Sequence, residues 1–422
     1  MYKIKNYETI YQKLYIEKRR EECYATRKIH AIAEKWFGRH LDIPSHYPGN
    51  GLPLDIQGEN GVAEMANQKE EMEYFQAPDI TVRITDRCNF HCIHCFVDSG
   101  SRVCENELST EELKSIIDWA ADNGSFRLGI TGGEPTLRKD LLEIITYAKS
   151  KNLWTMVTTN GYALSREFCK KLGDTQIDQV DVSLDHAAAD HHDQFRGQPG
   201  AYDCAIRTIK MLTQYEVPTA ITSVISSWNF DSFQQLYALA HESTVTMFKA
   251  DAFIAIGRGE MGLALTPLQF KWLYDWFIQN CDSHMLHDTF SDKFDFLYDQ
   301  ERYCANILDA ILGYRGMPIC EAGITRCTIT AQGTVLPCSY FSTPEFYAGN
   351  VRTSSLDEIW HNSEVMNTMR KRTDFEGICT SCEYNTLCRG GCRARAHFMG
   401  KTRYGPDPYC WIAYRKRSEE CV

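Results

Sequence analysis

From residue 79 onward, short runs of apolar, β-branched residues alternate with longer stretches whose apolar positions recur at helical spacing. This alternation is typical of βα units that build a parallel sheet covered by helices. Strands are predicted near residues 80–85, 126–131, 153–158, 178–184, 219–224 and 247–254. Helices are predicted between them, near residues 109–123, 138–151, 164–172, 201–214 and 230–241. These six units make a partial barrel, open on one side, whose active site is expected at the carboxyl ends of the strands.

The segments on either side of this barrel have different patterns. Residues 1–77 show helical spacing interrupted by a stretch rich in proline and glycine, which predicts a helical extension and a linker. Near residue 315 the βα alternation gives way to a field of cysteines. We therefore expect an α/β fold with a helical N-terminal extension at 1–77, a partial (β/α)6 barrel of TIM type at 78–315, and a small cysteine-rich C-terminal iron–sulfur domain at 316–422.

The chain has 422 residues, a net charge of −11 and 18 cysteines. Binding to nucleic acid depends on an excess of lysine and arginine, so this charge argues against a nucleic-acid partner. No apolar run reaches the roughly 18 residues of a membrane span, and the N-terminus does not resemble a signal peptide, so neither a membrane location nor secretion is expected. We expect a cytoplasmic protein, in which cysteines stay reduced and serve as metal ligands or catalytic thiols.

A cysteine triplet follows the first predicted strand: Cys88, Cys92 and Cys95, in the sequence ITDRCNFHCIHCF. Closely spaced thiolates are typical ligands of iron–sulfur clusters. Three of them hold a [4Fe–4S] cluster and leave one iron free for chemistry, like the open position of a catalytic metal site. Three unrelated buried thiols are the plain alternative, but two further motifs downstream argue against it.

The first of these motifs is TGGEP, which follows the second predicted strand and contains Gly132, Gly133 and Glu134. Glycine allows the backbone to approach a ligand closely, and a glutamate can accept hydrogen bonds from a ligand ammonium group. A Gly-Gly turn alone is a weak signal, because such turns are common between strands and helices. Next to the cysteine triplet it indicates a cofactor site.

The second motif is the C-terminal cysteine field, whose members are Cys320, Cys327, Cys338, Cys379, Cys382, Cys388, Cys392 and Cys410. These eight thiols make two complete four-thiolate sets. Zinc is an alternative occupant, because paired cysteines at this spacing also form tetrahedral zinc sites. If the sets hold iron–sulfur clusters, four thiolates leave no vacant iron, which favours electron transfer over substrate binding.

The triplet, the GGEP turn and Ser183-Leu184-Asp185 at a strand end resemble the radical S-adenosylmethionine (SAM) enzymes, over residues 79–260. The resemblance implies that the unique iron binds the amino and carboxylate groups of SAM. One electron from the cluster then cleaves SAM to a 5′-deoxyadenosyl radical, which abstracts a hydrogen atom from the substrate.

The resemblance also implies contacts with SAM, position by position. Phe96 would flank the adenine. Gly132, Gly133 and Glu134 would contact the methionyl amino group, and Ser183 and Asp185 would lie near the ribose. Asn160, followed by Gly161, is a further candidate for the same pocket. Arg196 would lie near the methionyl carboxylate, a role that suits a guanidinium, although a surface arginine is the plain alternative. Gly257-Arg258-Gly259 would pass near the adenine or form an ordinary turn.

The C-terminal field resembles the SPASM extension of these enzymes, which binds two auxiliary [4Fe–4S] clusters. On this resemblance the first set comprises Cys320, Cys327, Cys338 and Cys392, and the second comprises Cys379, Cys382, Cys388 and Cys410. Some relatives leave the position of Cys327 open. Together with the triplet, the chain would hold three clusters and bind SAM.

Within this family the segments CEAGITRC, YAGNV, CRGGC and GPDPYC resemble the peptide-modifying maturases, such as those of mycofactocin and pyrroloquinoline quinone. This implies an oxidoreductase that oxidises or crosslinks a side chain of a ribosomally made peptide, with a low-potential electron donor of flavodoxin or ferredoxin type. Residues 1–77 lack the strand triplet of a peptide-recognition module. Either a separate protein captures the peptide or the substrate has no leader.

Two other functions remain open at this point. The first is a radical enzyme acting on a small molecule, such as a porphyrin-pathway decarboxylase. Clustered basic residues able to receive several carboxylates would favour this function. The second is a non-catalytic metal-binding scaffold. No residue declares itself as the catalytic base, and Asp185, His186 and Arg258 are candidates only by their location at the open edge of the barrel.

Overall fold

The computed structural model describes residues 78–101, 105–162, 164–280, 320–371, 374–382 and 385–420. The predicted N-terminal extension and the predicted boundary near residue 315 lie outside these residues. What the structure describes is therefore the barrel and most of the C-terminal region.

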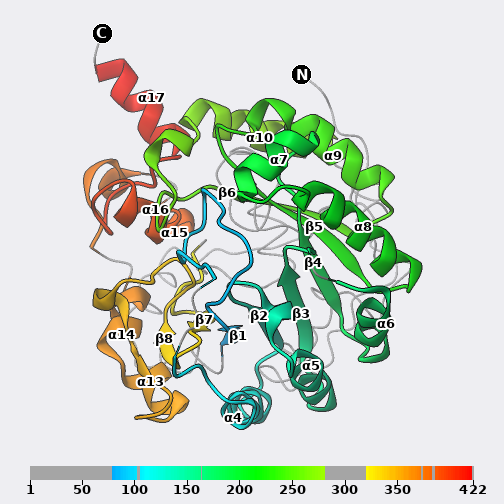
Figure 1. The fold of residues 1–422 in the computed structure, drawn as a ribbon. Helices are drawn as coiled ribbons and strands as arrows, with labels where there is room; N and C mark the ends of the chain where they lie inside the picture. Colours follow the sequence, from blue (N-terminus) through cyan, green and yellow to red (C-terminus); the bar gives the residue numbers. More distant parts are fainter. Residues whose placement is uncertain are drawn as a thin grey trace, which may run out of the picture.

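The six predicted strands are confirmed, and they form one parallel sheet in chain order (Figure 1). The strands are β1 (Asp79–Arg83), β2 (Arg127–Thr131), β3 (Trp154–Thr159), β4 (Gln179–Ser183), β5 (Thr219–Ile225) and β6 (Met247–Ala252). The five predicted helices are also present, as α4 (Thr110–Asp122), α5 (Leu141–Ser150), α6 (Arg166–Asp174), α8 (Ala201–Gln214) and α9 (Phe233–Glu242). The helix α10 (Pro267–Asn280) follows β6.

One helix of the barrel was not predicted. The helix α7 (Ala189–Arg196) has the sequence ADHHDQFR, which offers too few apolar positions to show a helical period. It ends at Gly197, whose φ of 63° lies in the left-handed region that favours glycine at a helix C-terminus.

The sheet continues into the C-terminal region instead of stopping at the barrel. Strand β7 (Arg326–Ile329) pairs in parallel with β1, and β8 (Thr334–Leu336) and β9 (Gly349–Asn350) follow as antiparallel strands. The remaining helices of this region are α13 (Leu356–Asn362), α14 (Glu364–Arg370), α15 (Asn385–Cys388), α16 (Arg393–Phe398) and α17 (Trp411–Glu420). The C-terminal region thus begins next to β1, the strand that leads into the cysteine triplet.

Side chains alternate between two faces along each barrel strand, as the two-residue period of a strand requires. In β1 and the residue after it, Ile80, Val82 and Ile84 belong to the main hydrophobic core, packed with residues of the surrounding helices. The residues between them, Thr81 and Arg83, therefore face the inside of the barrel, which we call the lumen. The same alternation assigns Ser183 in β4 and Lys249 in β6 to the lumen, because Val180, Val182, Phe248 and Ala250 are in the core.

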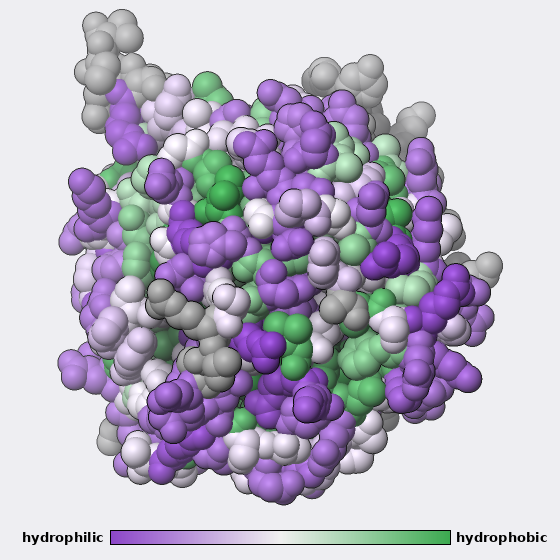
Figure 2. Space-filling model, in the orientation of Figure 1, coloured by the Kyte–Doolittle hydropathy of each residue, from purple (hydrophilic) through white to green (hydrophobic). Residues whose placement is uncertain are grey.

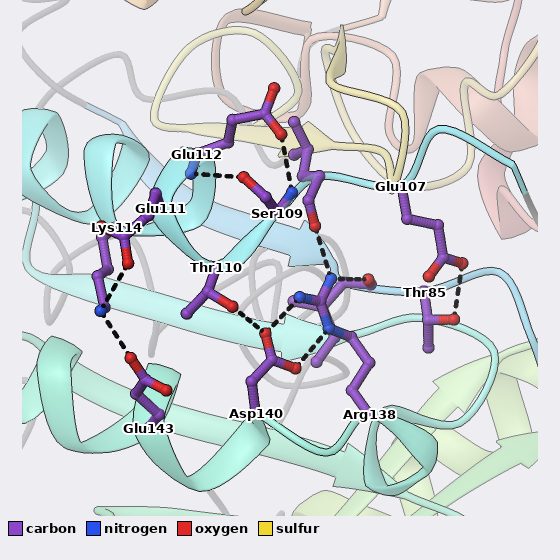
Figure 3. Close-up of polar contacts among 12 residues, drawn as sticks. Thr85, Glu107, Ser109, Thr110, Glu111, Glu112, Lys114, Arg138, Asp140 and Glu143 are labelled. Carbon is purple, nitrogen blue, oxygen red and sulfur yellow. Dashed lines mark hydrogen bonds and ion pairs between the residues drawn. The ribbon is translucent and has the colours of Figure 1, made fainter.

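A polar network holds the carboxyl end of β1 in place (Figure 3). The guanidinium of Arg138 donates to the carbonyl oxygens of Ile84 and Leu108, each at 2.8 Å, and pairs with Asp140. Asp140 also accepts from the hydroxyl of Thr110, at the start of α4, at 2.7 Å. Figure 3 shows that Arg138 and Asp140 point toward one another between α4 and α5. The network fixes the point from which the chain enters the cysteine triplet.

The surface seen in Figure 2 is mainly hydrophilic, with apolar groups interspersed among polar ones. Large apolar side chains that are exposed include Met261, Leu268, Trp272 and Tyr347. In the part of the chain that the structure describes, no helix has the length and apolar character needed to cross a membrane.

We expect Arg138→Ala to lower the free energy of unfolding of the cluster-free protein by roughly 2 kcal/mol, because buried carbonyl groups lose a charged donor. Denaturant titration followed by circular dichroism measures the change. Arg166→Ala is the matched control, since Arg166 is exposed in the first turn of α6. Equal midpoints for the two variants would contradict the role of the network.

Candidate functional site

The cysteine triplet lies in a loop that leaves the carboxyl end of β1; we call residues 85–101 the cluster loop. Cys88 and Cys92 are only 9% and 8% exposed. The loop closes at its base, where the amide of Cys88 donates to the carbonyl oxygen of Gly100 at 2.7 Å. Its thiols therefore face an interior site at the end of the barrel where βα loops converge.

The GGEP turn contacts this loop through the backbone. The amide of Gly133 donates to the carbonyl oxygen of Thr85 at 2.7 Å, and the amide of Glu134 donates to that of Arg87 at 2.9 Å. A Cβ atom on Gly132 or Gly133 would lie 2.3 Å from the carbonyl oxygen of Thr85 or Arg87, respectively. Both glycines are therefore required by the approach of the cluster loop itself.

The carboxylate of Glu134 is saturated by donors from the protein. One oxygen accepts from the amide and hydroxyl of Thr136, at 3.1 and 2.6 Å, and from the hydroxyl of Thr159 at 2.7 Å. The other accepts from the amide of Asn160 at 2.7 Å. Glu134 is 1% exposed, and its burial raises the pKa of this carboxyl. The side chain thus orders the turn against β3, and its predicted contact with a ligand amino group remains a prediction.

Asn160 extends this connection to the cluster loop. Its amide group donates to the side-chain oxygen of Asn89 at 2.8 Å, and Asn160 is 7% exposed. Ser183 is also 7% exposed and ends β4 on the lumen face. Among the described residues, it makes no hydrogen bond to the cluster loop or to the GGEP turn. The hydroxyl of Ser183 is therefore the better placed of the two to receive a ligand.

Arg196 and Asp185 form a buried ion pair beside the triplet. The Nε of Arg196 lies 2.5 Å from Oδ2 of Asp185, and its Nη1 lies 4.0 Å from the sulfur of Cys92. Burial disfavours the charged guanidinium, but the opposite charges of Asp185 and Cys92 outweigh it and raise the pKa of Arg196. The other oxygen of Asp185 accepts from the amide of Val224 at 2.8 Å. Asp185 therefore positions Arg196, and this arginine is not on the surface.

The segment Gly257-Arg258 was predicted to pass near a nucleobase or to form a plain turn, and its contacts are with the cluster loop. The amide and Nε of Arg258 donate to the carbonyl oxygens of Cys95 and Cys92, both at 2.9 Å. Its Nη1 donates to the carbonyl oxygen of Ser99 at 2.7 Å. Gly257 has a φ of 63°, and a Cβ there would lie 2.4 Å from the carbonyl oxygen of Cys95. In the sequence, the signal for these contacts is the Gly-Arg pair after the last barrel strand.

The three candidate bases all have structural contacts. Asp185 and Arg258 are engaged as described, and Nδ1 of His186 accepts from the amide of Ala188 at 2.9 Å. Burial of His186, next to His191, lowers its pKa. Because all three side chains make hydrogen bonds to the protein, the structure does not distinguish any of them as the catalytic base.

Phe96 connects the cluster loop with the C-terminal region. Its ring packs against that of Tyr340, with centroids 5.0 Å apart. Tyr340 follows Cys338 by two residues, and its amide donates to the sulfur of Cys338 at 3.4 Å. Phe96 and Tyr340 therefore form an apolar contact between the cluster loop and the segment that follows Cys338.

Four C-terminal cysteines, the members of the predicted second set, line one cavity: Cys379, Cys382, Cys388 and Cys410. Burial raises the pKa of Cys379 to about 11 and also raises that of Cys388 and Cys410. The sulfur of Cys410 accepts from the amide of Ala413 at 3.5 Å.

Cys320, Cys338 and Cys392 belong to, or pack against, a second apolar cluster that includes Ile254 and Phe341. Three members of the predicted first set therefore lie in or against the same apolar cluster. The amide of Cys392 donates to Oδ2 of Asp407 at 2.9 Å, which fixes the start of α16.

Cys327, the fourth predicted member, lies elsewhere. It is in β7, is 0% exposed and belongs to the main core, on the same face of the sheet as its neighbour Ile80. Thr328, on the opposite face, contacts Ser339 next to Cys338 at 2.9 Å. Burial raises the pKa of Cys327 to about 12. This packing gives no support to a ligand role for Cys327.

The thiols fit iron–sulfur clusters in their chemistry. Buried thiols with raised pKa values need a cation to stay ionised, and iron supplies that charge. Backbone amides donate to the sulfurs of Cys88, Cys338 and Cys410, and such hydrogen bonds are a feature of cluster sites. Among the described residues, no group of three or more Cys, His, Asp or Glu side chains is arranged to hold a single metal ion.

Comparison with known proteins agrees with these features. Residues 82–240 match the Radical SAM superfamily, and residues 320–383 match SPASM, an iron–sulfur cluster-binding domain. The AdoMet-dependent heme synthase of Methanosarcina barkeri is 32% identical over 336 residues, which cover 78% of this chain and 95% of that protein. The mycofactocin maturase MftC of Mycolicibacterium smegmatis is also 32% identical over 336 residues, 78% of this chain and 82% of that protein.

Solved structures share the fold at lower identity. Streptococcus suis SuiB bound to S-adenosylmethionine has a TM-score of 0.66 at 18% identity, covering 81% of this chain and 79% of that one. The protein anSMEcpe with bound AdoMet has a TM-score of 0.62 at 18% identity, covering 81% and 96%. These likenesses confirm the predicted partial barrel with a cysteine-rich C-terminal region.

Gly133→Ala is expected to prevent the triplet from holding its cluster, because the new methyl group would collide with the carbonyl of Arg87. Iron and sulfide analysis after anaerobic reconstitution should show a loss of about four irons per chain. The control is Gly100→Ala in the same loop, where a Cβ meets nothing within 4 Å. Full iron content in Gly133→Ala would show that the close contact between Gly133 and the cluster loop is not needed to hold the cluster.

Cys327→Ala should retain the iron content of the unmodified protein and should lower its stability by about 1–2 kcal/mol, because it removes a buried core atom. Cys338→Ala should lose about four irons under the same reconstitution. Iron analysis of the two variants side by side makes the comparison. An equal loss in both would show that Cys327 is a ligand.

Proposed function

The chain belongs to the radical SAM superfamily, and from this premise we propose that it modifies a side chain of a ribosomally made peptide or protein. The family membership makes it an enzyme of radical chemistry. The peptide substrate is supported by the similarity to the mycofactocin maturase MftC, which spans 82% of that protein. The observation that carries the chemistry is the buried triplet, held by contacts from several βα loops.

Three clusters are part of the proposal. Cys88, Cys92 and Cys95 would hold the first and leave one iron to SAM. The four cysteines that line the cavity, Cys379, Cys382, Cys388 and Cys410, would hold one auxiliary cluster. Cys320, Cys338 and Cys392 would hold the other. When bound, SAM and the first cluster supply a 5′-deoxyadenosyl radical after reduction by a low-potential donor of flavodoxin or ferredoxin type.

The protein residues around the triplet bind and orient SAM in this proposal. Arg196 presents its guanidinium beside Cys92, where it would receive the methionyl carboxylate. Phe96 offers an apolar face to the adenine, and the hydroxyl of Ser183 faces the lumen near the ribose position. Buried apolar residues around these groups exclude water, which protects a reactive intermediate.

The auxiliary sites would receive the second electron of a net two-electron oxidation. Phe96 and Tyr340 bring the cluster loop into contact with the segment after Cys338, so the two sites are close. Four-thiolate ligation around the cavity leaves no vacant iron, which suits electron transfer. A separate peptide-recognition protein and a cytoplasmic location complete the proposal.

A second candidate function is a reaction on a small molecule that bears several carboxylates. The similarity to the AdoMet-dependent heme synthase of M. barkeri spans 95% of that protein. The buried Arg83 on the lumen face, which forms no ion pair with a carboxylate of the described residues, would receive one carboxylate of such a molecule.

The proposed radical chemistry is tested by the release of 5′-deoxyadenosine from SAM under strong reduction, on anaerobically reconstituted protein. The unmodified protein should release the nucleoside, and the Cys88/Cys92/Cys95→Ala triple variant should lose about four irons and all cleavage. Cys169→Ala is the control, since Cys169 is a buried cysteine in α6, outside the cysteine sets. Nucleoside release from the triple variant, or none from the unmodified protein, would overturn the proposal.

The two substrate classes are separated by mass spectrometry of the products. Peptides encoded next to this chain and iron coproporphyrin III are supplied in parallel reactions. A change of peptide mass that requires SAM and the intact triplet supports the maturase. Turnover of the porphyrin alone would replace it with the second candidate.

A further inference from the structure

Arg83 is a buried guanidinium at the active-site end of the barrel. It ends β1 on the lumen face, two residues before the cluster loop begins, and it is only 6% exposed. The groups whose charges act on it include Asp86, Tyr347 and Cys95 of the triplet. Arg83 therefore ends the strand from which the chain enters the cysteine triplet.

This side chain is poorly satisfied by the protein. Its Nε is buried and has no hydrogen-bond partner, and its Nη1 has one long contact, to the hydroxyl of Ser342 at 3.5 Å. A contact of that length contributes little as a hydrogen bond. No ion pair joins Arg83 to a carboxylate within the described ranges. Burial disfavours its charged form and lowers the pKa of Arg83.

The other buried lysine and arginine side chains of the described residues have a carboxylate or several backbone acceptors, although Nη2 of Arg393 also has no hydrogen-bond partner. Arg196 pairs with Asp185 at 2.5 Å, Lys249 with Asp181 at 2.7 Å and Arg395 with Asp407 at 2.7 Å. Arg393 lacks a carboxylate, but it donates to the backbone carbonyl oxygens of Gly391, Arg403 and Gly405. Arg83 differs from all of them, because it has neither a carboxylate nor a set of backbone acceptors. A buried charge without a partner is costly, and an anionic ligand would offset that cost.

The position of Arg83 separates it from the proposed SAM contacts. Arg196 lies against the sulfur of Cys92 and comes from the end of α7, whereas Arg83 ends β1, and its one hydrogen bond is to Ser342. A second guanidinium at the triplet is not needed for the single carboxylate of SAM. A planar guanidinium is best matched by a carboxylate, which it binds through two parallel hydrogen bonds.

We infer that Arg83 binds a carboxylate of the substrate and holds it beside the cysteine triplet. The inference rests on the proposed function, because it names the chemical class of substrate for the same site. In a peptide, the carboxylate belongs to an acidic side chain or to the C-terminus. In a small molecule, it belongs to an acidic substituent such as a propionate. Both sources share the chemistry that Arg83 recognises.

The test uses the reconstituted protein with SAM bound and glutarate as the probe, with neutral dimethyl glutarate for comparison. Binding to the folded state raises the thermal unfolding midpoint. Glutarate should raise the midpoint of the unmodified protein by about 2 °C or more relative to the ester. The shift should vanish in Arg83→Gln and persist in part in Arg83→Lys, because lysine keeps the charge but loses the bidentate geometry.

Arg166→Gln is the matched control and should respond to glutarate as the unmodified protein does, because Arg166 is exposed on α6. Without probe, Arg83→Gln should unfold at a midpoint equal to or above that of the unmodified protein, since it removes an uncompensated buried charge. A lower midpoint would identify Arg83 as a structural residue. An equal glutarate shift in Arg83→Gln, or equal effects of glutarate and its ester, would overturn the inference.

Two further probes identify the source of the carboxylate: a short peptide with a free C-terminus against its C-terminal amide, and iron coproporphyrin III. Stabilisation that depends on Arg83 with either probe supports the inference and names the source. Release of 5′-deoxyadenosine is measured on the same preparations. Nucleoside release without any stabilisation dependent on Arg83 would overturn only this inference, whereas absence of release would overturn the radical function itself.

Discussion

Close backbone contact between the cluster loop and three βα loops is the constraint on which the rest of this structure depends. Gly133, Gly197 and Gly257 come from the loops after β2, β4 and β6, and a Cβ atom at any of them would lie within 2.5 Å of a cluster-loop carbonyl. The loop is thus enclosed on several sides by main chain. Because these contacts are made by the main chain, they fix the path of the loop that carries the three thiols.

The charges around this loop follow from the same arrangement. Asp185 is fully buried and directs Arg196 to the sulfur of Cys92, and Arg258 satisfies the carbonyl groups that the loop turns inward. On the other side, β7 pairs with β1, so the C-terminal region is joined to the strand that leads into the triplet. One continuous sheet therefore joins the strand that precedes the cluster loop to the strands of the C-terminal region.

Much of the barrel could be predicted because each buried strand is a short β-branched run and each covering helix has an apolar stripe. The helix α7 escaped prediction since ADHHDQFR has almost no such stripe. The roles of Glu134 and Arg258 could not be predicted, because they depend on partners far away in the chain: Arg258 and Cys92 are 166 residues apart. The packing of Cys327 could not be predicted from cysteine spacing, because the alternation of β7 turns its thiol toward the core. Its ligand role stays a prediction.

The central claim is that the triplet leaves one iron open to SAM. Electron–nuclear double resonance on the reduced protein, with SAM labelled by nitrogen-15 in its amino group, tests it most directly. The account predicts a nitrogen hyperfine coupling that appears with labelled SAM and is absent from the Cys88/Cys92/Cys95→Ala variant. A cluster signal that SAM leaves unchanged in the unmodified protein would contradict the account.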